Sequence, residues 1–162
     1  MELLTKKEYA SLAAALKFAT AAYIDGAYRP AASGKIFASV NPATGEKLAD
    51  IAACGSEDVD FAVTKAREAF DDGRWSRLHP SARKDVLIRF AKLLTRNARE
   101  LAVMESVDSG KTIFDCETVD IPETIDCIKW HAEAIDKLYD QDTVFTGNTY
   151  QNDQPDVAVY IQ

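Results

Sequence analysis

Apolar residues recur every three or four positions along much of the chain, which is the spacing that lines one face of an α-helix. The clearest stripe follows Ser56, a good N-cap residue, and ends at Asp71-Asp72-Gly73; it consists of Val59, Ala62, Val63, Ala66, Ala69 and Phe70. A second stripe, capped by Ser81, holds Val86, Leu87, Phe90, Leu93 and Leu94 opposite a wet side of Arg83, Lys84, Arg89 and Lys92. The pattern predicts two amphipathic helices here.

Three further helices are expected from the same periodicity. They are Lys7–Ala22, a shorter helix from an N-cap at Asn97 to a stop at Ser109-Gly110, and Ile121–Tyr139. Gly110 suits the left-handed conformation that ends many helices. Pro122 falls in the first turn of the last helix, where its missing N–H costs nothing.

Strand signals lie between the first two helices and at the C-terminal end. Asp25-Gly26 predicts a tight hairpin turn between Tyr23-Ile24 and Ala27-Tyr28. Ile36–Val40, the turn Asn41–Gly45 and the return strand Lys47–Ala53 predict a second hairpin. Thr143–Thr146 and Asp156–Ile161 indicate a β-ribbon. The predicted class is therefore α/β, or α+β within this chain: N-terminal β-hairpins, a layer of four to five helices and a C-terminal β-ribbon.

Composition restricts the classes of partner. The 162 residues are 47% hydrophobic and 28% charged, the profile of a folded globular domain. The net charge is −7 and the basic residues are scattered, which argues against nucleic acid or an anionic membrane as partner. The apolar run Leu12–Ala22 is too short to span a bilayer and lacks a signal-cleavage site. An odd number of cysteines fits a reducing compartment, so we expect a cytoplasmic location.

The residues by themselves do not define a catalytic centre. The seven glycines show neither GxGxxG nor GxxxxGK spacing. His79 and His131 lie in unrelated segments and are expected to be structural rather than catalytic or metal-binding. Cys54, Cys116 and Cys127 are expected to be small buried hydrophobes, and Trp75 and Trp130 to be packing anchors.

Several segments, taken in order, carry a family resemblance. Tyr23-Ile24-Asp25-Gly26 precedes Val40 and Asn-Pro-Ala-Thr-Gly at 41–45, and the helix from Asp58 to Phe70 is followed by Trp75. Residues 105–111, Glu-Ser-Val-Asp-Ser-Gly-Lys, are similar to Glu-Thr-x-Asp-x-Gly-Lys, with Ser106 in place of Thr. From about residue 20 onward the chain resembles the N-terminal portion of an NAD(P)-dependent aldehyde dehydrogenase. Asp120–Pro122 and Trp130–Lys137 look most like the branch that oxidises γ-glutamylamino-butyraldehyde and related amino-aldehydes.

The resemblance implies the oxidation of an aldehyde to an acid with NAD or NADP. In the family a Cys thiolate attacks the carbonyl, a backbone N–H and an Asn hold the oxyanion, hydride passes to the nicotinamide, and a Glu activates water. All of these residues belong to segments downstream of those matched here. We therefore expect no catalytic or cofactor-binding residue among the 162, and no binding of NAD or NADP by this chain alone.

The resemblance also implies one binding site within the chain. Family members often hold a structural Na⁺ or K⁺ through oxygens at the two residues before Asn-Pro and at the Asp of the Glu-Thr-x-Asp segment. Those positions are Ser39, Val40 and Asp108. Carbonyl and carboxylate oxygens suit a hard cation. The alternative is that Asp108 simply caps or bonds a loop.

The resemblance also leads to expectations about organisation. Residues 1–140 are expected to be an incomplete N-terminal part of a cofactor-binding domain, and residues 141–162 the start of an oligomerisation ribbon. The main hypothesis is an N-terminal piece of an aldehyde dehydrogenase that is inactive alone. The alternatives are a stand-alone assembly module that self-associates through the ribbon, and one half of a split enzyme whose partner is the missing catalytic portion.

Overall fold

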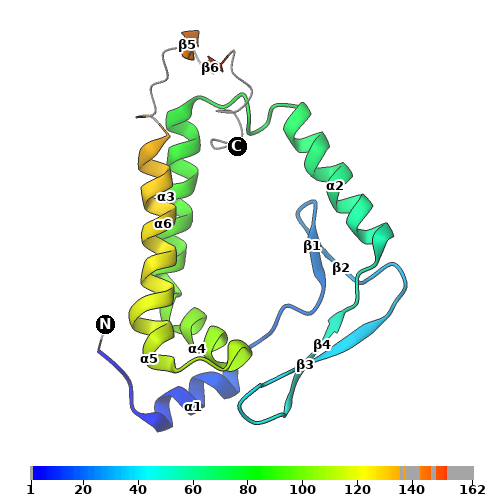
Figure 1. Ribbon diagram of the computed structural model, residues 1–162, viewed down its shortest axis with the longest axis vertical. Helices are drawn as coiled ribbons and strands as arrows, with labels where there is room; N and C mark the ends of the chain where they lie inside the picture. The colour runs from blue at the N-terminus through cyan, green and yellow to red at the C-terminus, as the bar shows by residue number, and fades with distance from the viewer. Residues whose placement is uncertain (1, 136, 138–142, 147–148, 153–162) are drawn as a thin grey trace. The chain divides into compact units, whose positions relative to one another are not determined.

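A computed structural model describes residues 2–135, 137, 143–146 and 149–152 (Figure 1). In chain order the elements are α1 (Lys6–Ala15), β1 (Ala22–Ile24), β2 (Ala27–Arg29), β3 (Ile36–Val40), β4 (Lys47–Ala52), α2 (Ser56–Asp71), α3 (Pro80–Arg96), α4 (Ala98–Ser109), α5 (Ile113–Asp115), the π-helical turn η1 (Cys116–Asp120), α6 (Ile121–Ala134), β5 (Thr143–Thr146) and β6 (Thr149–Asn152). The mixed α/β class is confirmed. Within the described residues, no helix has the length and apolar character needed to cross a membrane.

The chain divides into two compact units, which are described separately. The first comprises residues 1–66 and 97–123, and the second residues 67–96 and 124–162. The predicted boundary at residue 140, between a cofactor-domain part and a ribbon, is a different division and stays a prediction.

Both N-terminal hairpins form where the sequence predicts them. β1 pairs antiparallel with β2, and the turn residues Asp25 and Gly26 have φ values of 53° and 75°. Positive φ at both central positions is the requirement of a type I′ turn. β3 pairs antiparallel with β4, with a register shift between Ser39 and Val40.

The first helix is shorter than predicted. Thr5 and Glu8 form a capping box at its start, and α1 ends at Ala15 rather than Ala22. Leu16 has an extended ψ of 141°, and the carbonyl of Thr20 accepts a hydrogen bond of 2.8 Å from the N–H of Ala52. The segment after α1 is therefore used by the second hairpin, and this pairing competes with continuation of the helix.

Helix α2 begins one residue earlier than predicted, because Ser56 is its first helical residue and not its N-cap. The N-cap is Gly55, whose carbonyl accepts from Val59 N at 3.1 Å and whose N–H donates to Asp58 Oδ2 at 2.8 Å. Asp58 Oδ1 also accepts from the N–H of Ala32 at 2.8 Å. These hydrogen bonds lower the pKa of Asp58, and the bond from Gly55 has the largest effect.

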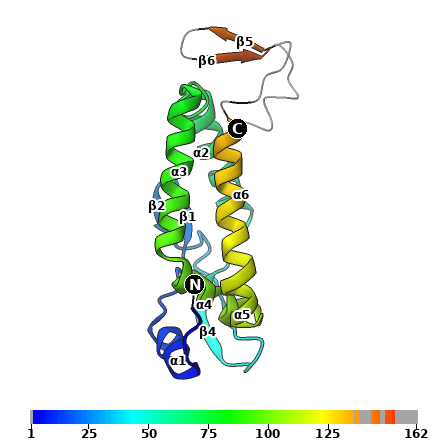
Figure 2. The same ribbon diagram turned by 90° about the vertical axis from the view of Figure 1, so that its left-hand side faces the viewer.

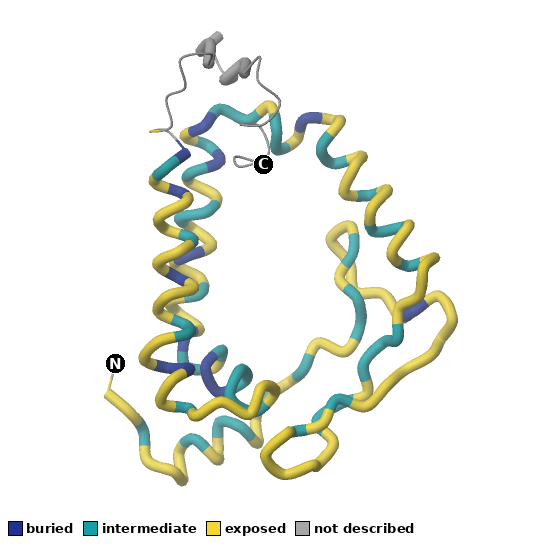
Figure 3. The backbone as a smooth tube through the Cα atoms, viewed as in Figure 1, coloured by how far each residue is buried: buried dark blue, intermediate teal, exposed yellow. Residues whose placement is uncertain are grey.

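The apolar stripe of α2 is open to solvent. Val59 and Val63 are 55% and 61% exposed, and the whole helix consists of exposed or half-buried residues (Figure 3). The periodicity therefore gave the helix correctly, while the face that it marks is uncovered in this structure.

Helix α3 is capped by His79 rather than by Ser81. The carbonyl of His79 accepts from the N–H groups of Ala82 and Arg83, and His79 Nδ1 accepts from Ser81 N at 3.3 Å. Pro80 is then the first helical residue, the position that tolerates a missing N–H. Imidazole nitrogen here takes the place of the side-chain oxygen on which cap prediction relies.

Within the second unit, α3 and α6 lie side by side (Figure 2). Lys84 Nζ of α3 and Glu133 Oε2 of α6 are 3.0 Å apart. Arg83, predicted on the wet side, is buried, whereas Phe90 and Leu93 of the predicted apolar stripe are each 46% exposed. The prediction was wrong for these residues, because a helical period marks an apolar face without showing which side chains a neighbouring helix covers.

Helix α6 begins at Ile121, as predicted, but it continues directly from α5 and η1 and ends at Ala134, before the predicted Tyr139. Thr112 caps α5 by accepting from Asp115 N at 3.2 Å, and helix continues through α5, η1 and α6 to Ala134. Pro122 lies in the first turn of α6, as predicted, but continuous helical backbone precedes it. The π turn η1 lies just before Pro122, and π turns and prolines are both recognised interruptions of regular α-helical hydrogen bonding. Of the predicted stretch up to Tyr139, residues 136, 138 and 139 lie outside the described residues.

A small core lies where α4, η1 and α1 meet in the first unit. Its fully or nearly fully buried members are Ala98, Ala102, Val103 and Cys116. Every residue of α1 is exposed or half-buried, and this helix is attached through a polar contact: Tyr9 Oη donates to Glu117 Oε2.

The C-terminal ribbon forms, but its second strand follows the first more closely in the sequence than predicted. β5 pairs antiparallel with β6, joining Thr143 to Asn152 and Thr146 to Thr149. The first predicted strand, Thr143–Thr146, is confirmed. The second predicted strand, Asp156–Ile161, lies outside the described residues.

Candidate functional site

The structure brings Ser39 and Asp108, two of the three residues predicted to hold a cation, into contact. Ser39 and Val40 end strand β3 at its register shift, and Asp108 lies in the last turn of α4. Ser39 Oγ donates a hydrogen bond of 3.2 Å to Asp108 Oδ1. Two segments 69 residues apart in sequence therefore meet at the predicted position.

A glycine permits this approach of strand and helix. Gly110 ends α4 with a left-handed φ of 78°. A Cβ added to Gly110 would lie 2.8 Å from Pro42 Cγ, which is too close for any real side chain. Both the helix stop and the contact with the Asn41-Pro42 turn therefore require glycine.

The turn itself is held by one asparagine. The carbonyl of Asn41 accepts from Gly45 N at 2.7 Å, and its side-chain Oδ1 accepts from Ala43 N at 2.9 Å. Asparagine thus supplies both the backbone and the side-chain acceptor of the turn, as expected before proline. This fixes the end of β3 on which Ser39 and Val40 lie.

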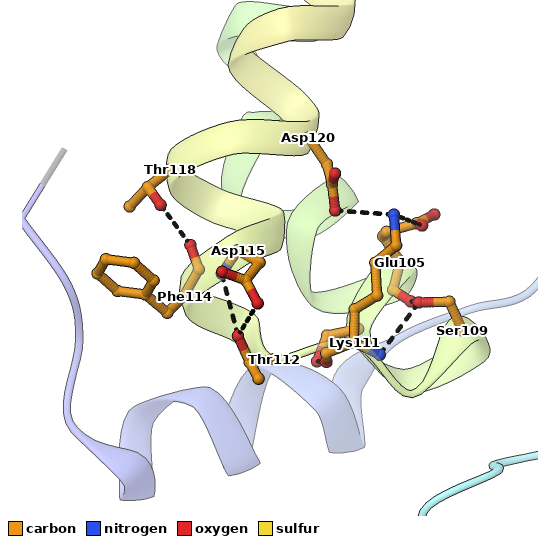
Figure 4. Close-up of polar contacts among 9 residues, drawn as sticks. Glu105, Ser109, Lys111, Thr112, Phe114, Asp115, Thr118 and Asp120 are labelled. Atoms are coloured by element: carbon orange, nitrogen blue, oxygen red, sulfur yellow. Dashed lines mark hydrogen bonds and ion pairs between the residues drawn. The ribbon is translucent and has the colours of Figure 1, made fainter.

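The segment Glu105–Lys111 is braced by its own side chains (Figure 4). Ser109 Oγ donates to the carbonyl of Glu105 at 2.6 Å, and Ser106 Oγ donates to the carbonyl of Lys111 at 2.8 Å. Lys111 Nζ contacts Asp120 Oδ2 at 3.0 Å and Glu105 Oε1 at 3.5 Å. These partners, Asp120 foremost, raise the pKa of Lys111.

The oxygens gathered here have the chemistry of a hard-cation site. Asp108 offers a carboxylate and Ser39 a hydroxyl, and these two groups are in contact; Val40 follows Ser39 at the register shift. The Ser39–Asp108 bond equally fits the alternative in which Asp108 bonds a loop, so the ion stays a prediction. Among the described residues, no group of three or more His, Cys, Asp or Glu side chains could hold a metal.

The cysteines occupy three different environments. Cys116 is fully buried, and burial raises its pKa, which favours the thiol over the nucleophilic thiolate. Cys54 and Cys127 are exposed, so the expectation of buried hydrophobes is wrong for both. Trp130 is also 66% exposed and is not the packing anchor predicted.

Sequence reasoning missed the polar cluster of Tyr9, Arg99 and Glu117, in which Glu117 is buried and the other two residues are half-buried. Arg99 donates to Glu117 Oε1 through Nε at 3.0 Å and through Nη2 at 2.8 Å. Arg99 Nη2 also donates to the carbonyl of Glu2 at 2.6 Å. The three side chains come from separate helical elements, and no periodicity in the sequence signals such a meeting.

Comparison with known proteins places these features in a family. The sequence model described as "Aldehyde dehydrogenase family" matches residues 28–159. The chain is 56% identical over 139 residues to an aminoacetaldehyde dehydrogenase of Pseudomonas aeruginosa, covering 86% of this chain and 28% of that protein. It is 44% identical over 117 residues to the NADP/NAD-dependent aldehyde dehydrogenase PuuC of Escherichia coli, covering 72% of this chain and 24% of that protein.

Solved structures agree. An indole-3-acetaldehyde dehydrogenase of P. syringae, crystallised with NAD⁺ and IAA, matches with a TM-score of 0.84 and 46% identity over 90% of this chain and 29% of that one. A gamma-glutamyl-gamma-aminobutyraldehyde dehydrogenase of Burkholderia cenocepacia matches with a TM-score of 0.83 and 44% identity, over 89% of this chain and 29% of that one. The chain thus spans less than a third of the length of these relatives. It belongs to the aldehyde dehydrogenase family.

Proposed function

We propose that this chain is the N-terminal scaffold of an NAD(P)-dependent enzyme that oxidises an amino-aldehyde to the corresponding acid. The observation that carries the proposal is the 56% identity over 139 residues to an aminoacetaldehyde dehydrogenase. The structural match to a gamma-glutamyl-gamma-aminobutyraldehyde dehydrogenase supports the same substrate class. Three free cysteines support a reducing, cytoplasmic compartment.

The 162 residues alone are proposed to be inactive. Aldehyde oxidation in this family requires an activated thiolate, an oxyanion site and a bound nicotinamide. The segments matched here supply instead the hairpins, the braced Glu105–Lys111 segment and the helices around them. Cys116, the cysteine nearest to that segment, is buried with a raised pKa.

An assay of the purified 162-residue chain tests this proposal. Aminoacetaldehyde and NAD⁺ or NADP⁺ are supplied, and reduced nicotinamide is followed by absorbance, with the P. aeruginosa relative as the positive control. We expect no rate above the enzyme-free blank. A steady rate that disappears in Cys54→Ser or Cys127→Ser would overturn the proposal that the scaffold lacks the reaction centre.

A structural Na⁺ or K⁺ at Ser39, Val40 and Asp108 is the second part of the proposal. It is supported by the 3.2 Å contact between Ser39 and Asp108 and by the all-oxygen donor set. The thermal midpoint is expected to rise in KCl or NaCl relative to tetramethylammonium chloride at equal ionic strength. Asp108→Asn should abolish this difference, while the exposed-site control Asp60→Asn should keep it. An equal ion effect in both variants would contradict a site at Asp108.

Self-association is proposed through the ribbon of β5 and β6. Among the described residues, β5 and β6 pair with each other and with no further strand, and unpaired strand edges add readily to another chain. Light scattering is expected to show an oligomer for residues 1–162 and a smaller species for residues 1–142. Equal masses for the two would contradict assembly through the ribbon.

A further inference from the structure

A cysteine and a histidine form an exposed pair on α6. Cys127 and His131 are four residues apart, which places them one above the other on the same helical face. Both are exposed, and Cys127 Sγ lies 3.6 Å from His131 Nδ1. Thiolate and imidazole are the two side chains that borderline divalent metals prefer.

The spacing of the two atoms matches a tetrahedral zinc centre. Sulfur and nitrogen ligands lie at about 2.3 Å and about 2.0 Å from zinc, so at the tetrahedral angle they are about 3.5 Å apart. The observed separation of 3.6 Å is close to this value, and binding requires the His131 ring to turn so that Nδ1 leaves the Cys127 carbonyl. We propose that Cys127 and His131 are a two-ligand binding site for Zn²⁺ or a similar borderline divalent ion, independent of the family's cation site and of aldehyde oxidation.

The protons can be accounted for. His131 Nδ1 lies 2.9 Å from the carbonyl of Cys127, so in the metal-free chain Nδ1–H donates to that carbonyl. Metal binding moves this proton to Nε2, and the carbonyl keeps the N–H of His131 through the ordinary helical bond. The Cys127 thiol loses its proton to solvent. One proton is therefore released for each ion bound.

The remaining coordination positions are open. Among the described residues no third Asp, Glu, His or Cys completes a group with this pair, so water supplies the other ligands of the ion. Binding is consequently expected to be weaker than in a structural four-ligand zinc site. The ring of Trp130 lies 4.9 Å from that of His131, close enough for its fluorescence to respond to a bound ion.

The chain contains its own matched controls. Cys54 is also exposed, and His79 is the second histidine. Binding of Co²⁺ and Zn²⁺ to the 162-residue chain is measured by the thiolate-to-cobalt absorption band and by calorimetry. The variants are Cys127→Ser, His131→Asn, Cys54→Ser and His79→Asn. Asparagine at 79 can still act as a helix cap, so this control keeps the start of α3.

We expect one ion per chain, a thiolate–cobalt band, quenching of Trp130 and release of one proton. Affinity should fall at least about tenfold in Cys127→Ser and in His131→Asn, as it does when ligand support is lost in other metal sites. Cys54→Ser and His79→Asn should bind as the wild type does. An unchanged affinity in either α6 variant, or an equal loss in the Cys54 or His79 controls, would overturn the proposal; circular dichroism verifies that each variant is folded.

Discussion

Arg99 donates two hydrogen bonds to one carboxylate oxygen of Glu117, from Nε at 3.0 Å and from Nη2 at 2.8 Å. The other oxygen of Glu117 accepts a hydrogen bond from the Tyr9 hydroxyl. The Glu117 side chain is only 2% exposed, and that of Arg99 is 29% exposed. A buried carboxylate needs both partners because the surrounding protein solvates it poorly.

Replacing Glu117 should therefore destabilise the first unit. Glu117→Gln keeps the size of the side chain and removes its charge, which leaves Arg99 without its counter-ion. We expect the free energy of unfolding in urea to fall by about 2 kcal/mol, less than for a fully buried pair because Arg99 reaches solvent. Glu100→Gln, at an exposed neighbouring site on α4, should change it by less than about 0.5 kcal/mol. Equal losses in the two variants would contradict a special role for Glu117.

Tyr9 should make the docking of α1 sensitive to alkali. Burial, and next the hydrogen bond to Glu117, raise the pKa of Tyr9 above its ordinary value of 10.0. A raised folded-state pKa contributes stability that is complete below pH 10 and is lost as the pH rises through the folded value. Proteolytic cleavage within α1 should therefore accelerate above pH 10 in the wild type. In Tyr9→Phe it should be fast already at pH 8 and show a weaker dependence on pH.

Alanine substitutions at two glycines distinguish the energetic cost of a left-handed backbone from the cost of a steric clash. Gly45 and Gly110 have φ values of 74° and 78°, but only at Gly110 does an added Cβ meet Pro42. Gly45→Ala should cost about 1–2 kcal/mol, the penalty of a left-handed alanine. Gly110→Ala should cost measurably more by urea unfolding, since the helix stop or the Asn41-Pro42 turn must shift. Similar costs at both sites would show that the Pro42 contact yields easily.

The pairing of α3 with α6 should weaken in acid. Hydrogen bonds from Lys137 and then Lys84 lower the pKa of Glu133 below its ordinary value of 4.5. A lowered folded-state pKa contributes stability that is complete above the ordinary value and is lost as the pH falls through the folded one. The acid-unfolding midpoint, followed by circular dichroism, should therefore rise to a higher pH in Glu133→Gln. Glu100→Gln should leave it in place.

The sequence predicted the helices, strands and turns better than it predicted which side chains are buried and which residues cap the helices. The Asp25-Gly26 turn, the Asn41–Gly45 turn and the Gly110 stop depend on backbone conformations that single residues encode, and all three are confirmed. The segment after α1 bonds to the second hairpin through Thr20 and Ala52, and α3 is capped by an imidazole. Neither is visible in a hydrophobic pattern.

The candidate site shows the same division. Ser39, Val40 and Asp108 could be named because a motif fixes their positions, and the structure brings Ser39 and Asp108 into contact. The burial of Arg83 and the exposure of Trp130 could not be foreseen, because periodicity marks an apolar face without showing which neighbour covers it.

Asp58 has a consequence for the order in which the first unit folds. Its carboxylate joins the start of α2 to Ala32, 26 residues earlier, and the β3–β4 hairpin lies within that span. A hairpin forms from local contacts in microseconds, and once formed it brings the two ends of the span closer together. Most of the entropy cost of closing this loop is then incurred when the hairpin forms, rather than when the carboxylate accepts its hydrogen bonds. We therefore expect the Asp58 hydrogen bonds to form late, after the hairpin has closed the loop.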